Sequence, residues 1–162
     1  HGASGVLDIP LVFNPQSGIH AGVEPRASVG AHELVYTFNG PITQMAWAEI
    51  YNEFGTQISS ANISQRVVGN DVIVTLNHPG DRRRRAIRMT GVNGVANTSM
   101  EIGFLIGDVD ANGAVSVEDC AAVLARNGQM ADGNNARFDI DASGMIDAAD
   151  VHALNICPAV GP

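Results

Sequence analysis

The sequence predicts a chain in two parts, an all-β sandwich over residues 6–106 followed by a small all-α segment over residues 107–158. Short stretches of alternating apolar and polar residues fill the first part, with turn-forming dipeptides between them. Two alanine-rich stretches with apolar residues at helical spacing fill the second part, each preceded by an aspartate- and glycine-rich loop. With 162 residues and 45 % hydrophobic content, the chain is long enough to build a packed core in each part.

Seven stretches of the first part are predicted as strands. Val72, Val74 and Leu76, for example, alternate with other residues in the way that is typical of a strand buried on one face. The predicted strands are residues 6–13, 32–38, 43–51, 63–68, 71–77, 84–90 and 99–106. About seven strands with regular turns favour an immunoglobulin-like sandwich, although this part lacks the cysteine pair of antibody domains. Trp47, in the third predicted strand, is expected to lie in the core.

The charge of the chain is concentrated in the second part. Residues 1–106 carry a net charge of −1 and residues 107–162 a net charge of −7, which together make the −8 of the whole chain. A short segment that acidic repels itself when it folds unless cations neutralise it. Nucleic acid is therefore an unfavourable partner, and no apolar run reaches the roughly 18–20 residues that span a membrane.

Two 12-residue loops in the second part, beginning at Asp108 and at Asp139, repeat one pattern 31 positions apart. Each offers oxygen ligands at loop positions 1, 3, 5, 7, 9 and 12 and has glycine at position 6, where a sharp turn is needed. Calcium takes six to eight oxygen ligands and is bound by loops with this spacing. The sequence therefore predicts two calcium ions, with the position-7 residues acting through their carbonyl groups. The predicted ligands are Asp108, Asp110, Asn112, Ala114, Ser116 and Asp119 in the first loop, and Asp139, Asp141, Ser143, Met145, Asp147 and Asp150 in the second.

Helix capping is the alternative explanation for these acidic residues. It accounts for Asp119 and Asp150, which lie in the first turns of helical stretches predicted over residues 117–128 and 147–156, and leaves the other aspartates clustered without a counter-ion. An ordinary EF-hand pair also fits poorly, because it has a helix before each loop and a glutamate at position 12. Here a strand-like stretch precedes the first loop, and position 12 is aspartate in both.

A calcium loop followed by one helix, present twice, resembles the type I dockerin module, with its two half EF-hands. The resemblance covers roughly residues 107–158 and rests on the ligand pattern. It implies two calcium ions, two antiparallel helices and a cohesin-like protein partner in a secreted, extracellular assembly that degrades polysaccharide, such as a cellulosome. The preceding sandwich is similar in arrangement to the immunoglobulin-like X modules of some cellulosomal proteins.

The same resemblance implies a partner surface on the two helices and loop ends. Loop positions 10 and 11, which often carry a hydroxyl pair in dockerins, differ between the two repeats, which argues against symmetric docking in two orientations. The expected partner-binding residues are Val117, Glu118, Ala121, Ala125, Arg126, Ala148, Ala149 and His152. If the helices pair antiparallel as in dockerins, Cys120 and Cys157 lie close enough for a disulfide, which an extracellular setting allows. Two free buried cysteines are the alternative.

No catalytic set is recognisable in the sequence, so a non-catalytic function is expected. Two other functions remain open: a calcium-stabilised spacer or anchor without a cohesin partner, and a glycan-binding sandwich that uses Trp47 or Tyr51 as a stacking surface. The arginine cluster of residues 82–85 and Arg88 is expected to line a solvated edge strand, where charge discourages edge-to-edge pairing, or else to contact the acidic repeats.

Overall fold

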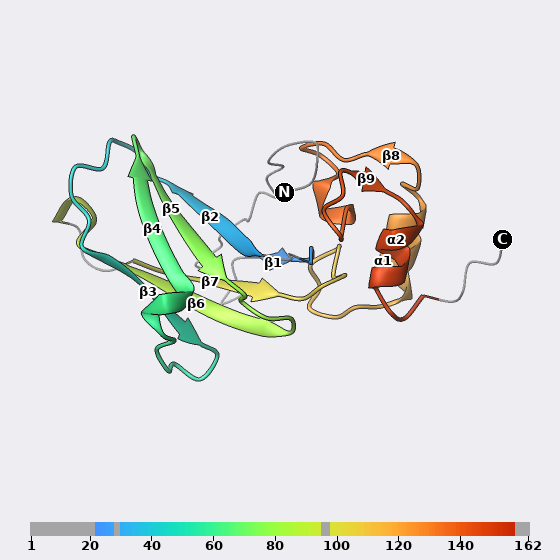
Figure 1. Ribbon diagram of the computed structural model, residues 1–162, viewed down its shortest axis with the longest axis horizontal. Helices are drawn as coiled ribbons and strands as arrows, with labels where there is room; N and C mark the ends of the chain where they lie inside the picture. The colour runs from blue at the N-terminus through green and yellow to red at the C-terminus, as the bar shows by residue number, and fades with distance from the viewer. Residues whose placement is uncertain (1–21, 28–29, 95–97, 158–162) are drawn as a thin grey trace. The chain divides into compact units, whose positions relative to one another are not determined.

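The computed structural model describes residues 22–27, 30–94 and 98–157, and the strand expected at residues 6–13 lies outside them. The described chain divides into two compact units (Figure 1). Residues 30–102 form the first unit, and residues 103–157 form the second together with the N-terminal residues 22–27. The second unit is therefore discontinuous in sequence.

Two sheets build the first unit. One sheet has the order β2-β5-β4, and the other has β7, β6 and β3 as neighbours. Their bounds are β2 (Ala31–Thr37), β3 (Trp47–Asn52), β4 (Ile63–Val68), β5 (Asp71–Asn77), β6 (Arg83–Thr90) and β7 (Thr98–Phe104), with the 3-10 turns η1 (Ser60–Asn62) and η2 (Val92–Gly94) between strands. Each of the six remaining predicted strands overlaps one of these.

The core of the first unit is lined by alternate residues of its strands. On β5 the side chains of Val72, Val74 and Leu76 are fully buried, whereas the residues between them are partly exposed. Both sheets contribute buried apolar side chains: Leu34, Tyr36, Val72, Val74 and Leu76 from one, and Ala48, Ile50, Ile87, Met89 and Ile102 from the other. This two-sheet architecture fits a β-sandwich.

The expectation that Trp47 lies in the core is wrong, because its side chain is 71 % exposed. The buried residues of β3 are Ala48 and Ile50, so Trp47 lies on the outer face of the strand together with Glu49 and Tyr51. Successive side chains of a strand point to opposite faces. Glu49 lies on the outer face of β3, and Trp47, two residues before it, therefore lies on that face as well.

The expectation of an all-α second part is also wrong. The protein is mostly sheet, and the described residues contain only two helices, α1 (Val117–Leu124) and α2 (Ala148–Ala153), both short. The second unit also contains strands β1 (Val23–Glu24), β8 (Gln129–Met130) and β9 (Met145–Ile146) and the 3-10 turn η3 (Ala136–Phe138). β1 pairs in parallel with the end of β7, and β8 pairs antiparallel with β9.

The two helices end earlier than predicted, and a residue beyond each of them has a left-handed backbone conformation. Gly128 has φ of 84° and Asn155 has φ of 54°, and neither conformation continues an α-helix. Most of the remaining chain of this unit forms the two aspartate loops and a connection between them that contains turns, β8 and η3. None of the described helices is long and apolar enough to cross a membrane.

A small apolar core holds the second unit together. Side chains from both loops, from η3 and from both helices meet in it, and α1 packs against α2. Its buried members are Val109, Cys120, Val123, Phe138, Ile140, Ile146, Val151 and Leu154. Because Val109 and Ile140 are the second residues of the two loops, the core anchors the start of each loop.

Candidate metal centre

The first loop brings three aspartates together. Carboxylate oxygens of Asp108, Asp110 and Asp119 all lie within 4.8 Å of one another. Asp108 and Asp119 are fully buried, whereas Asp110 is exposed. Three converging carboxylates at this spacing offer the oxygen ligands that a hard divalent cation prefers.

Backbone N–H groups hold these carboxylates in place. Asp108 accepts hydrogen bonds from the N–H groups of Asn112 at 3.0 Å and Gly113 at 2.9 Å. Asp119, at N3 of α1, accepts from the N–H of Val109 at 2.9 Å and from the N–H and hydroxyl of Ser116 at 2.9 Å and 3.0 Å. The loop is thereby closed on itself, with its first and last ligand positions side by side.

The second loop repeats this arrangement residue by residue. Asp139, Asp141 and Asp150 form the equivalent triad, again within 4.8 Å. Asp139 accepts from the N–H groups of Ser143 and Gly144, both at 2.9 Å, in the way that Asp108 accepts in the first loop. Asp150 accepts from the N–H of Ile140 at 2.6 Å and of Asp147 at 2.8 Å.

Backbone conformation is repeated as well. Gly113 and Gly144, at loop position 6, have φ of 90° and 95°, and Ala111 and Ala142, at position 4, have φ of 62° and 55°. Left-handed conformations at position 4 cost an alanine roughly 1–2 kcal/mol each. Both loops have this unfavourable conformation at the same position. The interactions that hold the loop geometry therefore outweigh the preference of alanine for other backbone conformations.

Burial makes the negative charge in these loops unfavourable. Burial is the largest cause that raises the pKa of Asp108, Asp139 and Asp150 above the ordinary value of 3.8. Neighbouring carboxylates raise these pKa values further, and the backbone N–H groups lower them only in part. None of the ion pairs found among the described residues includes a loop aspartate. A divalent cation would supply the missing positive charge, so the residues fit such an ion.

The remaining predicted ligands lie in the same loops. Asn112 Oδ1 accepts from the N–H of Ala114 at 2.9 Å, and Ser116 bonds to Asp119 as described above. In the second loop the Ser143 hydroxyl donates to the carbonyl of Met145 at 3.1 Å. Asp147 caps α2 by accepting from the N–H of Ala149 at 2.7 Å.

The structure leaves most of the expected partner-binding residues exposed. These are Val117, Glu118, Ala121, Ala125, Ala148, Ala149 and His152. Arg126 differs from them because its guanidinium carbon lies 3.7 Å from the centroid of the Phe138 ring. The same guanidinium donates to the carbonyl of Ala122 at 2.8 Å. Arg126 therefore has packing and hydrogen-bonding roles within the unit.

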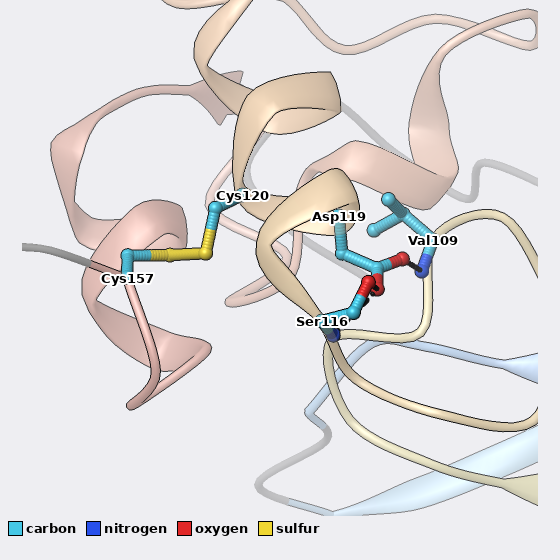
Figure 2. The surroundings of a disulfide bond; sticks show 5 residues. All are labelled: Val109, Ser116, Asp119, Cys120 and Cys157. Carbon is cyan, nitrogen blue, oxygen red and sulfur yellow. Dashed lines mark hydrogen bonds between the residues drawn. A yellow bond between two sulfur atoms is a disulfide. The ribbon is translucent and has the colours of Figure 1, made fainter.

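A disulfide joins Cys120 and Cys157, whose Cα atoms lie 5.7 Å apart. Figure 2 shows the bond between α1 and the segment that follows α2, with Cys120 next in sequence to Asp119 of the first aspartate triad. The bridge thus ties the end of the second repeat to the helix turn that carries the last ligand position of the first.

The arginine cluster finds its described ion-pair partners among residues outside the aspartate loops. Arg83 and Arg85 both pair with Glu53, at 3.0 Å and 3.1 Å, and Arg82 lies 3.8 Å from Asp81. Arg88 lies over the ring of Tyr51 at 4.7 Å.

Sequence reasoning missed one part of this centre, the N-terminal residues 22–27. They belong to the second unit and form hydrogen bonds at the start of both loops. No local signal marks them, because two residues of parallel pairing produce no periodicity that a sequence window detects.

Comparison with protein-family models found no match to this chain, and comparison with curated proteins found none either.

Proposed function

We propose that the loops of residues 108–119 and 139–150 bind two calcium ions, and that the calcium-loaded unit docks onto a protein partner of the cohesin class in a secreted assembly. The observation that carries the proposal is the repeated geometry of two carboxylate triads, each with two buried aspartates, for which no ion-pair partner is found in the described chain. Two calcium ions would reduce the net charge of residues 107–162 from −7 to about −3.

Calcium binding is tested by calorimetric titration of the whole chain. We expect two calcium ions per chain, and one fewer strong site in each of Asp108→Asn and Asp139→Asn. Asp132→Asn is the matched control, because Asp132 is an exposed acid of the same unit that lies outside both triads. Absence of calcium binding, or loss of a site in the control, would contradict the proposal.

The exposed alanines of the two helices support docking onto a flat surface. Ala121 on α1 and Ala148 and Ala149 on α2 are exposed, and small side chains allow the backbone of a partner to approach closely. Val117 adds an apolar side chain that is 59 % exposed beside them. Calcium would act on docking indirectly, by ordering the loops from which both helices begin.

Docking is tested against a panel of purified cohesin modules, with calcium and with chelator. We expect binding only with calcium, and weaker binding by Ala121→Arg and Ala149→Arg at unchanged calcium affinity. Asn127→Arg is a control that adds the same charge at an exposed position beyond the end of α1. If no cohesin binds the calcium-loaded chain, the spacer or anchor function is favoured instead.

One observation favours a second candidate function, glycan binding by the outer face of β3. Beside the exposed Trp47, the Tyr51 hydroxyl donates to Glu49 at 2.9 Å, and the Gln57 amide donates to the same carboxylate at 3.3 Å. A flat aromatic ring with fixed polar groups beside it suits a sugar, which has an apolar ring face and hydroxyl edges.

Glycan binding has a direct readout, because Trp47 is the only tryptophan of the chain. We expect soluble cell-wall oligosaccharides to change its fluorescence, and Trp47→Ala to abolish retention on the polysaccharide. Phe54→Ala is the control, since Phe54 is 84 % exposed but lies in the turn that follows β3, outside the strand. An unchanged emission spectrum with all oligosaccharides tested would exclude this second function.

A further inference from the structure

Residues 22–27, which we call the strap, hydrogen-bond to the chain that leads into the first loop. The strap carbonyls of Gly22, Glu24 and Pro25 accept from three successive partners, the N–H groups of Gly103 at 3.0 Å, Leu105 at 3.2 Å and Gly107 at 2.8 Å. Gly107 immediately precedes Asp108, the first ligand position of the first loop.

The other end of the strap contacts the second loop. The N–H of Ala27 donates to the carbonyl of Ile140 at 2.7 Å. Ile140 immediately follows Asp139, and its own N–H donates to the carboxylate of Asp150 at 2.6 Å. The backbone of a single residue, Ile140, therefore links the strap on one side to a predicted calcium ligand on the other.

The strap forms a hydrogen-bonded connection between the starts of the two loops. None of the backbone hydrogen bonds among the described residues joins residues 108–119 directly to residues 139–150. Strand β9, in the second loop, pairs instead with β8, which lies outside both loops. The two repeats also share the apolar core, and the Cys120–Cys157 bridge joins the helix turn at the end of the first loop to the segment after α2.

A buried ion pair makes the strap rigid. Arg26 donates to Glu24 from its backbone N–H at 3.0 Å, from Nε at 2.8 Å and from Nη2 at 2.9 Å. Both side chains are largely buried, and two guanidinium hydrogen bonds to one carboxylate fix its orientation. Pro25 between them fixes φ and has no N–H to satisfy.

We infer that the strap positions both loops and couples the two calcium sites, so that calcium at one site raises the affinity of the other. The inference rests on the calcium binding proposed above. Calcium in the second loop fixes the Ile140 peptide, and this orders Ala27 and the strap. The ordered strap holds Gly107 and hence Asp108, so the first loop loses less freedom when it binds its ion.

The coupling is measured by a mutant cycle in the whole chain. Asp108→Asn removes the first site, and the affinity of the second site is compared with and without that change. With the natural strap we expect the second site to weaken about fivefold or more. We call the ratio of the two affinities the coupling factor. In the Arg26→Ala and Ala27→Pro backgrounds we expect the coupling factor to fall toward one, because the link between the loops is broken.

Arg66→Ala is the matched control, since it removes an arginine from an ion pair of the first unit, with Glu33 at 2.6 Å. The coupling factor should be unchanged in it. An undiminished coupling factor in both strap variants would overturn the inference while leaving calcium binding intact. If the unsubstituted chain binds no calcium, the proposed function and this inference both fall.

Amide hydrogen exchange tests the same link without a substitution, in case a strap variant does not fold. Calcium should slow exchange of the Ala27 N–H at least about fivefold. The Ile58 N–H, which donates to Ile50 in the first unit at 2.8 Å, serves as the control and should not change. Equal exchange of the Ala27 amide with and without bound calcium would overturn the strap's role.

Discussion

Gly107 lies so close to Leu154 that a β-carbon at residue 107 would come within 2.5 Å of Leu154 Cδ2. Gly107 also has φ of 91°, a conformation that side-chain-bearing residues rarely adopt. The residue before the first loop thus packs directly on the core residue at the end of α2.

Gly107→Ala is expected to destabilise the second unit by roughly 2–4 kcal/mol, because it adds a clash to an unfavourable backbone conformation. Thermal unfolding followed by the helical signal measures the change. Gly133→Ala is the control, since a β-carbon there meets no atom within 4 Å and φ is not in the left-handed region. Equal unfolding temperatures for the two variants would contradict the packing of Gly107 against Leu154.

Reduction of the Cys120–Cys157 bridge is expected to lower the stability of the second unit by about 4 kcal/mol, because the bridge closes a loop of 37 residues in the unfolded chain. Intact mass should rise by about 2 Da on reduction, as two hydrogens are added. Unfolding in denaturant then gives the stability difference. The first unit is the internal control, because the chain has no other cysteines. Two thiols that react in denaturant before any reductant is added would refute the bridge.

Acidification is expected to stabilise the ion-free second unit. Folding raises the pKa of Asp108, Asp139 and Asp150, and a raised carboxyl pKa favours the folded state at low pH. The contribution of these three carboxyl groups to the stability of the folded unit is lost as the pH rises from 3.8 through the raised pKa values. With calcium bound the direction reverses, because protons compete with calcium for the carboxylates.

Unfolding curves of the helical signal at several pH values measure how the stability of the second unit changes with pH, once with chelator and once with calcium. The first unit provides a contrast through Glu33, whose pKa is lowered mainly by the hydrogen bond from Arg66. Its contribution is present above the ordinary pKa of 4.5 and is lost as the pH falls through the lowered value. Parallel pH dependence of the second unit with chelator and with calcium would be inconsistent with carboxylates as the calcium ligands.

Arg126→Ala is expected to destabilise the second unit by about 1–2 kcal/mol, since it removes the contact with the Phe138 ring and the hydrogen bond to Ala122. Denaturant unfolding measures the loss. Arg137→Ala is the comparison, because the buried Nε of Arg137 has no hydrogen-bond partner in the described structure. If Arg126→Ala weakens partner binding without any loss of stability, Arg126 acts at the docking surface instead.

Local pattern in the sequence predicted most of the secondary structure. Alternation placed the strands around Val74 and Ile87 because a strand's two faces meet different environments. The same rule places Trp47 with Glu49 on one face, and the prediction that Trp47 lies in the core was wrong. The all-α prediction was wrong because alanine-rich spacing indicates helix locally but does not show that the chain around the two helices forms strands β1, β8 and β9, turns and loops.

The sequence alone determined the repeat, and with it the residues that form each loop, because their ligand spacing is local in the chain. Only the tertiary structure decided which distant residues meet those loops. The strap contacts Gly107 and Ile140 across 82 and 113 positions of sequence, and Arg126 reaches Phe138 across a turn. Such contacts arise from the packing of the whole chain. A parallel pair of two residues forms wherever two segments are brought together, and it leaves no periodic pattern of apolar residues in either segment.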